Sequence, residues 1–215
     1  SITNDTLLTG KTSDAVSTTS SEAIYYNGLF TVPNPDGLGP TRGDAFEFTN
    51  AAGAVLLRPS PDHRQGLLAA DLGSDGESYD MIAIPRGGSR LPFSAPGDGG
   101  LTMRMPDGPA VFTAAVDGMV RSGRKVLAQA GLGAAEIATW APHQANKRIV
   151  ARVGQTLGLE RAEWLGTLHR HGNSSAATIP LALSCRVAEG GPLRPGPILL
   201  SAFGAGTLWG SLIWR

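Results

Sequence analysis

Two polar side chains, His143 and Asn173, are the residues of this sequence best suited to catalysis. His143 follows Pro142 and precedes a helix-forming segment, and Asn173 stands between Gly172 and a second such segment. Junctions between a strand and a helix expose backbone N–H groups and side chains. An imidazole and an amide at two such junctions could both donate hydrogen bonds to one thioester carbonyl oxygen as negative charge develops on it.

Each of these residues alone also has a simpler structural explanation. A single histidine after a proline is most often a surface-loop residue, and Asn173 could be only a helix N-cap. An N-cap does not explain why two junctions carry such a side chain. A thioester site usually also holds a nucleophilic cysteine, but the only cysteine, Cys185, falls within an apolar helical pattern typical of a small core residue. The sequence therefore predicts half of an active site.

Two other patterns need a chemical interpretation. The segment Gly204-Ala205-Gly206 predicts a tight turn, and a backbone N–H exposed there could serve as an oxyanion donor. Its spacing to Gly210 does not fit a dinucleotide-binding motif, and too little chain follows for the required helix. His169 and His171 form a His-x-His pair, but no cysteine or carboxylate cluster lies nearby, so we expect no metal site.

The elements that must position these residues alternate between strand and helix, which predicts an α/β protein. Three helices are expected at 107–130, 146–157 and 174–189, with Pro180 kinking the last. Strands are expected at 53–57, 66–72, 137–140, 164–168, 198–203 and 208–214, the first one buried and the last two forming an antiparallel hairpin. Residues 1–8 could form a further strand, residues 9–44 a long polar loop, and residues 85–100 a boundary between two halves.

The composition excludes several classes of protein. Eighteen basic residues balance eighteen acidic ones, so nothing indicates a nucleic-acid-binding surface. No apolar run approaches the roughly 20 residues needed to cross a bilayer. A single cysteine excludes an internal disulfide framework and favours the cytoplasm. The first residues show neither an initiator Met nor a signal-peptide pattern, and read as if the chain began within a longer protein.

Four segments together resemble the C-terminal half of β-ketoacyl-acyl-carrier-protein synthase III, in the thiolase superfamily. They are residues 112–127, 141–149, 172–180 and 202–210, and residues 50–57 are similar to a degraded form of that family's GDGAGA strand. The resemblance covers about residues 45–215. It implies an α/β, thiolase-like fold with α-β-α-β-α layers. Residues 1–95 would be the end of the N-terminal half, with a long polar loop, and residues 96–215 the C-terminal half.

The resemblance also implies roles for individual residues in a Cys-His-Asn active site. His143 and Asn173 match the histidine and asparagine that bind the thioester oxygen of a malonyl-type extender as CO2 leaves. Four more positions match family residues: Ala205 (an oxyanion-hole backbone N–H), Phe203 (an aromatic beside the nucleophile), Asn146 (an asparagine that orders a water near the phosphopantetheine arm) and Arg148 (a basic residue for carrier-protein docking).

Three departures from the family pattern suggest a specialised relative. The family's cysteine would precede residue 1. Asn50-Ala51 stands where the family usually has Gly-Asp. His169 and His171 stand where an acidic and an aromatic residue are expected.

The implied function is that of the C-terminal part of an enzyme that condenses an acyl thioester with a malonyl-type thioester. The cysteine would come from the enzyme's own N-terminal portion or from a companion chain. Two alternatives stay open: acyl transfer to an alcohol or amine with His143 as general base, and a non-catalytic stabilising or carrier-docking subunit. The expected substrates are phosphopantetheine thioesters of CoA or acyl carrier protein, with no bound cofactor. The expected assembly is a cytoplasmic homodimer of the complete unit.

Overall fold

A computed structural model describes the backbone of residues 23–28 and the full residues 51–94 and 103–215. The strand expected at residues 1–8 lies outside the described residues, as does most of the loop expected at 9–44. Within that expected loop the chain forms strand β1 (Ala23–Gly28). The prediction of a loop was therefore wrong for these six residues.

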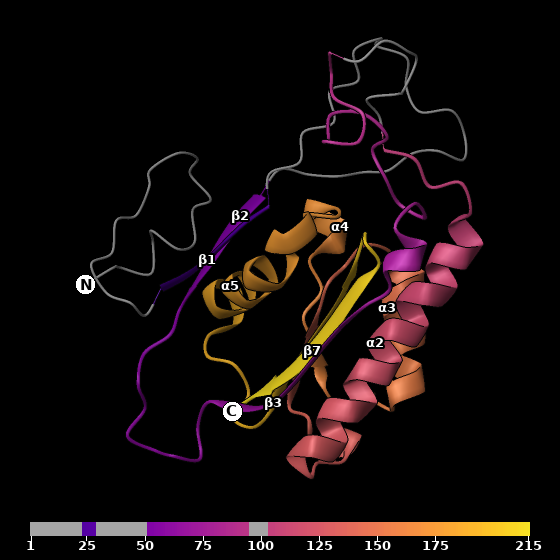
Figure 1. The fold of residues 1–215 in the computed structure, drawn as a ribbon. Helices are drawn as coiled ribbons and strands as arrows, with labels where there is room; N and C mark the ends of the chain where they lie inside the picture. The colour runs from indigo at the N-terminus through magenta and orange to yellow at the C-terminus, as the bar shows by residue number, and fades with distance from the viewer. Residues whose placement is uncertain (1–22, 29–50, 95–102) are drawn as a thin grey trace.

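A five-stranded mixed sheet forms the centre of the structure (Figure 1). Its strand order is β3-β7-β6-β4-β5. Strand β4 pairs in parallel with both β5 and β6, whereas β7 is antiparallel to its neighbours β6 and β3. The strands are β3 (Leu67–Ser74), β4 (Thr139–Pro142), β5 (Glu163–Trp164), β6 (Ile198–Gly204) and β7 (Leu208–Trp214).

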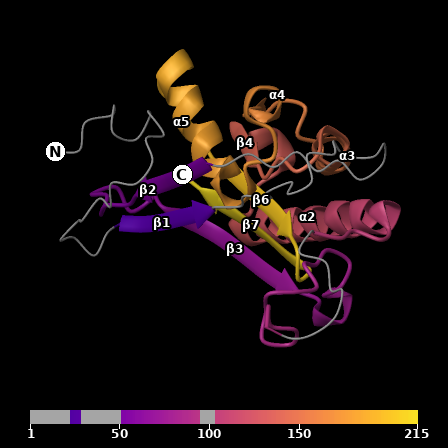
Figure 2. The same cartoon turned by 90° about the horizontal axis from the view of Figure 1, so that it is seen from above.

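Helices α2 (Gly108–Ala130) and α3 (Lys147–Leu157) cover one face of this sheet (Figure 2). Local signals set their ends. The Asp107 carboxylate accepts from the N–H of Ala110 at the start of α2, and Gly131 ends α2 in a left-handed conformation with φ of 65°. The main core lies between these helices and the sheet, and its fully buried members include Met119, Val126, Val153, Leu199 and Ile213.

Helix α5 (Thr178–Gly190) packs on the opposite face, so helices lie on both sides of the sheet (Figure 1). It follows the short helix α4 (Leu168–His171) and the 3-10 turn η3 (Ser175–Ala177). The Arg186 guanidinium of α5 pairs with the Glu163 carboxylate of β5 at 2.5 Å, which ties the helix to the edge of the sheet.

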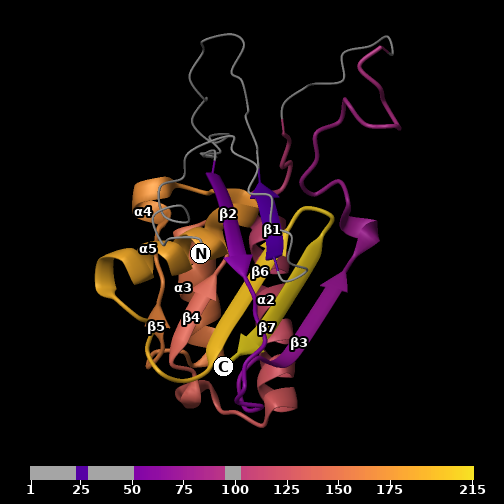
Figure 3. The same cartoon turned by 90° about the vertical axis from the view of Figure 1, so that its left-hand side faces the viewer.

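A second, two-stranded sheet lies on the α5 side (Figure 3). It consists of β1 and β2 (Ala51–Leu56), paired antiparallel, and β2 contacts α5 and η3. A Cβ atom on Gly53 would lie 2.4 Å from Cγ of Pro180, so only glycine permits this close approach. The strand predicted at 53–57 is confirmed, but its predicted burial was wrong. Its residues alternate between half-buried and exposed, because β2 pairs with β1 outside the central sheet.

Two other predictions about local structure were wrong. The strand predicted at 164–168 ends at Trp164, because the chain leaves the sheet and begins α4 at Leu168. Pro180 was predicted to kink a helix starting at residue 174. Instead, α5 begins at Thr178, so Pro180 lies in its first turn, where its missing N–H removes no intrahelical bond.

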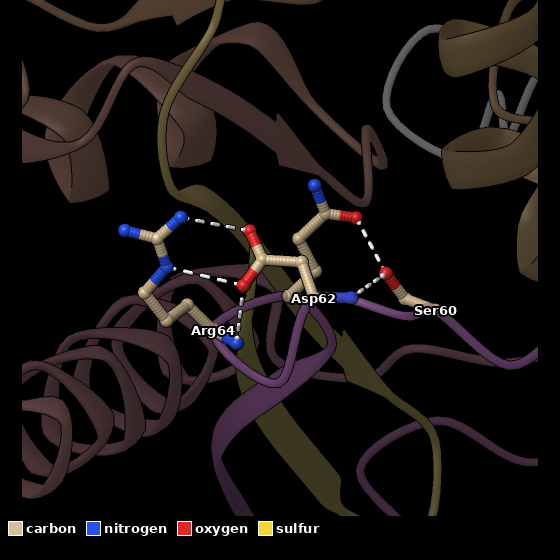
Figure 4. A network of polar contacts seen from close by, with 4 residues as sticks. Ser60, Asp62 and Arg64 are labelled. Atoms are coloured by element: carbon tan, nitrogen blue, oxygen red, sulfur yellow. Dashed lines mark hydrogen bonds and ion pairs between the residues drawn. The ribbon is translucent and has the colours of Figure 1, made fainter.

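The connection between β2 and β3 is held by a small polar network (Figure 4). The Arg64 guanidinium contacts both carboxylate oxygens of Asp62, at 3.1 and 3.2 Å. The Ser60 hydroxyl donates to the Gln65 side chain at 2.9 Å. These side chains are largely exposed, and exposed ion pairs contribute little to stability, so the network shapes the loop rather than forming a site.

Two broader predictions bear on the whole chain. The central sheet takes β3 from the predicted 1–95 region and its other four strands from 96–215, so the two regions share one sheet. The division at residue 95 stays a prediction. Among the described residues, no helix combines the length and apolar character needed to span a bilayer.

Candidate active site

The predicted site residues follow three parallel strands at the same edge of the sheet. His143 comes directly after β4, Asn173 lies in the segment after β5, and Ala205 begins the turn after β6. Strands β5, β4 and β6 are adjacent and parallel, so their carboxyl ends meet at one edge. Ligands of α/β sheets usually bind at such an edge.

The His143 ring is held by groups from η3 and α5. Its backbone N–H extends the sheet by donating to the Ser201 carbonyl at 2.8 Å. Its Nδ1 lies 3.2 Å from the Thr178 hydroxyl oxygen. Burial lowers the pKa of the His143 imidazole from 6.5 to about 4, against a smaller opposing effect of a backbone hydrogen bond with Ser175. The ring is therefore neutral at pH 7 and is oriented by its Nδ1 side.

Asn173 shares a neighbour with His143. Its side-chain Oδ1 accepts from the Ser175 backbone N–H at 3.0 Å, and the Ser175 carbonyl lies 2.8 Å from the Thr178 hydroxyl that contacts His143. Ser175 has a φ of 50°, rare for a residue other than glycine, and this local bend turns the chain at the site. Ser175 thus links both predicted catalytic side chains. Because Oδ1 of Asn173 is occupied, its amide N–H groups remain to serve another acceptor.

Gln144 is a site residue that the sequence argument did not single out. Its side chain is fully buried. Its Nε2 donates to the Leu165 carbonyl at 2.8 Å, and its Oε1 accepts from the backbone N–H of Thr167 at 2.8 Å and of Leu168 at 3.0 Å. The residue after His143 therefore fixes the start of the segment that leads to Asn173. The sequence held one indication of this role, because Gln144 lies within the 141–149 segment that resembles the family.

Thr178 is the second such residue. Its side chain is fully buried. The hydroxyl lies 2.8 Å from the Ser175 carbonyl, 3.2 Å from Nδ1 of His143 and 3.4 Å from the Ser174 hydroxyl. The sequence showed Thr178 inside the 172–180 motif, but its contact with a histidine 35 residues away is created by the fold.

The other predicted site residues lie around this centre in different ways. Asn146 is exposed and caps α3, accepting from the Arg148 N–H at 2.7 Å, and the Arg148 side chain is exposed on the first turn. Phe203 is partly buried against the core beneath α2, near Gly118, on the face opposite α5. Ala205 is exposed in the β6–β7 turn. None of these four takes part in the contacts that join His143 to Ser175 and Thr178.

Cys185 lies on α5, where its half-buried Sγ is 3.9 Å from Nε2 of His171. Burial raises the pKa of the Cys185 thiol, so it stays protonated at neutral pH and is a poor nucleophile. In the part of the chain that the structure describes, no group of three or more His, Cys, Asp or Glu residues is arranged to hold a metal ion.

The sequence of residues 127–215 matches the family model of the 3-oxoacyl-[acyl-carrier-protein] synthase III C-terminal region. This match includes His143, Asn173 and Ala205. A 3-oxopimeloyl-[acyl-carrier-protein] synthase of Rhodothermus marinus is 46% identical over 164 residues, which are 75% of this chain and 47% of that protein. A β-ketoacyl-[acyl-carrier-protein] synthase III of Streptomyces coelicolor is 45% identical, over 78% of this chain and 52% of that protein.

Solved structures agree with these relatives. The crystal structure of 3-oxoacyl-(acyl carrier protein) synthase III from Pseudomonas aeruginosa has a TM-score of 0.67 at 40% identity, covering 78% of this chain and 50% of that one. A priming β-ketosynthase from a polyketide biosynthetic pathway gives a TM-score of 0.69 at 30% identity, with 78% and 49% covered. These likenesses confirm the predicted thiolase-like α/β fold.

The chain spans about half the length of the curated relatives it matches. Its matched part carries the histidine, the asparagine and the glycine-rich turn in the order and at the strand ends described above. The chain is therefore similar to proteins of the β-ketoacyl-acyl-carrier-protein synthase III family, and residues 127–215 match that family's C-terminal region.

Proposed function

We propose that this chain supplies the decarboxylating half of a β-ketoacyl synthase III active site. The observation that carries the proposal is that one short turn contacts both side chains. The Ser175 N–H donates to Asn173, and the Thr178 hydroxyl, bonded to the Ser175 carbonyl, lies 3.2 Å from Nδ1 of His143. The relatives named above are acyl-carrier-protein synthases, which supports condensation of two acyl thioesters as the reaction class.

In this reaction a malonyl-type thioester loses CO2, and the electron pair of the broken C–C bond forms an enolate whose charge rests on the thioester oxygen. The Asn173 amide, oriented by the bond from the Ser175 N–H to its Oδ1, donates an N–H to that oxygen. The His143 Nε2 side donates as the second group. Fixed donors in a water-poor pocket stabilise such charge strongly, because they need no reorganisation during the reaction.

The enolate carbon then attacks an acyl group held as a thioester on a cysteine, forming the new C–C bond and releasing the thiolate. Cys185 is not this cysteine, because its thiol is protonated and its Sγ contacts His171 rather than His143. The nucleophile comes from a region outside the described residues or from a companion chain. We call this chain together with its cysteine-bearing region the assembled unit. The exposed Ala205 backbone N–H completes the oxyanion hole for the acyl carbonyl.

The low basicity of His143 separates condensation from acyl transfer to an alcohol or amine. A general base for such an acceptor works best with a pKa near the working pH, whereas the pKa of His143 is lowered to about 4. A neutral imidazole of low basicity suits hydrogen-bond donation better than proton abstraction.

The substrates we propose are phosphopantetheine thioesters of CoA or of an acyl carrier protein. Asn146 and Arg148 are both exposed at the start of α3, beside the His143 loop. Asn146 would order water near the pantetheine arm, and Arg148 would contact the acidic carrier protein. Phe203 would border the acyl group from the β6 end. The complete unit would be a homodimer.

The test is an assay of CO2 release from a malonyl thioester by the assembled unit. His143→Ala and Asn173→Ala should each lower kcat by about 100-fold to 1000-fold, the loss typical of one oxyanion donor. Acylation of the nucleophilic cysteine, followed by intact mass, should persist in both variants. The control is His63→Ala, which removes an exposed histidine from the β2–β3 loop. Unchanged CO2 release in both site variants would overturn the proposed function.

A further inference from the structure

The Thr178 hydroxyl is a buried polar group beside Nδ1 of His143 that the proposed reaction does not yet use. It has a single proton and lies between two acceptors, the Ser175 carbonyl at 2.8 Å and Nδ1 of His143 at 3.2 Å. The proton can serve only one of them at a time. The direction of this hydroxyl proton therefore decides whether Nδ1 of His143 accepts or donates a hydrogen bond.

The two settings of this hydroxyl correspond to the two neutral forms of the imidazole. When Thr178 donates to Ser175, its oxygen can only accept from His143, so Nδ1 carries the ring proton and Nε2 has a bare lone pair. When Thr178 donates to Nδ1, the ring proton sits on Nε2. Burial keeps the ring neutral at pH 7, so it has one proton to place.

The Ser175 carbonyl does not depend on the hydroxyl. It already accepts the backbone N–H of Thr178 at the end of η3. The Thr178 hydroxyl can therefore turn to Nδ1 without leaving a buried carbonyl unpaired. The Ser174 hydroxyl, fully buried and 3.4 Å away, can still donate to the Thr178 oxygen in either setting.

We propose that Thr178 is a positioning residue whose hydroxyl, by donating to Nδ1 of His143, places the ring proton on Nε2, where the thioester oxygen binds. This inference rests on the proposed function, because it states how His143 becomes a donor there. A substrate oxygen at Nε2 favours the Nε2–H form, and Thr178 makes that form attainable by satisfying the buried Nδ1. Thr178 itself touches neither substrate nor the reacting atoms.

Removal of the hydroxyl should fix the ring in the other form. In Thr178→Val, which has nearly the same shape, a bare Nδ1 would have no donor, so the ring favours the Nδ1–H form. We expect kcat for CO2 release from malonyl-CoA to fall about 10-fold to 100-fold, because reaching the Nε2–H form then leaves Nδ1 as an unpaired buried acceptor, with little change in KM. Thr178→Ser keeps the hydroxyl and should restore most of kcat.

The matched control is Thr156→Val. The Thr156 hydroxyl also bonds back to its own helix, donating to the Arg152 carbonyl at 2.7 Å, but it lies exposed at the end of α3. This control removes the same chemical group from the same kind of helical bond, so it should leave kcat and KM unchanged.

The deciding readout is histidine-selective 15N NMR of the assembled unit, with the His143 signal assigned by its loss in His143→Ala. With a non-hydrolysable malonyl thioester analogue bound, wild type and Thr178→Ser should show the Nε2–H form, and Thr178→Val the Nδ1–H form. The same tautomer in wild type and Thr178→Val would overturn the inference, as would a kcat loss in Thr178→Ser as large as that in Thr178→Val. If His143→Ala itself leaves CO2 release intact, the proposed function has failed instead.

Discussion

His143 combines a polar ring with a partly buried position, and this combination sets its chemistry. Burial lowers the pKa of its imidazole to about 4, so at neutral pH the ring is uncharged and its protons are assigned by its neighbours. Ser175 and Thr178 are those neighbours, the first in η3 and the second at the start of α5. A single turn of chain therefore orients the histidine and, through Ser175, the Asn173 amide.

The lowered pKa of His143 predicts a pH dependence of stability. Between pH 6.5 and about 4 the unfolded chain binds a proton at this residue that the folded chain excludes. The free energy of unfolding therefore decreases as pH falls through this window, by about 3 kcal/mol in all for this residue. Below the folded pKa the loss is complete and constant.

The measurement is urea unfolding across this pH window for wild type and His143→Gln. The variant cannot take up the proton, so its stability should decrease less steeply in acid. The pKa of Asp71 is lowered mainly by its hydrogen bond with Lys125, so Asp71 also costs stability in acid, but equally in both proteins. Parallel curves for the two proteins would contradict the buried, neutral histidine.

At the scale of elements, the site depends on how the segment after β5 is held against the loop after β4. Gln144 makes three hydrogen bonds to that segment from a fully buried position. A side-chain amide is well suited to this task because it carries both donors and an acceptor. One buried glutamine thus holds the loop that carries His143 against the segment that leads to Asn173.

Replacement of Gln144 by Leu should separate these strand ends. It leaves the Leu165 carbonyl and the N–H groups of Thr167 and Leu168 without their partner, and should lower the free energy of unfolding by about 2–4 kcal/mol. Hydrogen exchange at residues 165–173 should accelerate. Gln155→Leu on the exposed side of α3 serves as the control. Equal stability of the two variants would show that Gln144 does not hold this segment.

The contact between β2 and α5 makes a second prediction at this scale. Gly53→Ala would place a Cβ 2.4 Å from Cγ of Pro180, a distance that real contacts do not allow, so β2 must move away from the start of α5. The expected cost is about 1–3 kcal/mol of unfolding free energy. Gly76→Ala is the matched control, because its Cβ would meet nothing within 4 Å. Equal melting temperatures for the two variants would contradict this packing.

The sequence predicted those elements whose ends carry local signals. Asp107 and Asn146 start α2 and α3, and Gly131 and Gly158 end them, because caps and left-handed glycines act within one turn of chain. The short length of β5 and the pairing of β2 with β1 were not predicted, because strand length and pairing depend on distant segments. For the same reason the sequence indicated His143 and Asn173, but the supporting contacts of Thr178 and Gln144 emerged only from the fold.

At the scale of the whole molecule, the α5 face of the sheet is covered only in part. Helix α5 packs over β4, while the edge formed by β3 and β7 exposes large apolar side chains. Leu72 is 84% exposed and Leu208 is 53% exposed, and they lie near each other on paired strands. Contiguous exposed apolar surface of this kind commonly marks a contact with another protein surface. We propose that the cysteine-bearing region covers it.

This uncovered face predicts that residues 1–215 alone associate with one another. Analytical ultracentrifugation should show dimers or larger species, and Leu72→Ser should shift the distribution towards monomer because it removes the most exposed apolar side chain on β3. The substitution of Tyr79, half-exposed outside the sheet, by Ser is the control. A monodisperse wild-type monomer with a sharp, cooperative unfolding transition would contradict the prediction.

The most direct test of the account is a crystal structure of the assembled unit with a non-hydrolysable malonyl thioester analogue. The account predicts that the carbonyl oxygen of the analogue lies within hydrogen-bond distance of both Nε2 of His143 and the side-chain amide nitrogen of Asn173. An analogue bound with that oxygen away from both groups would contradict it.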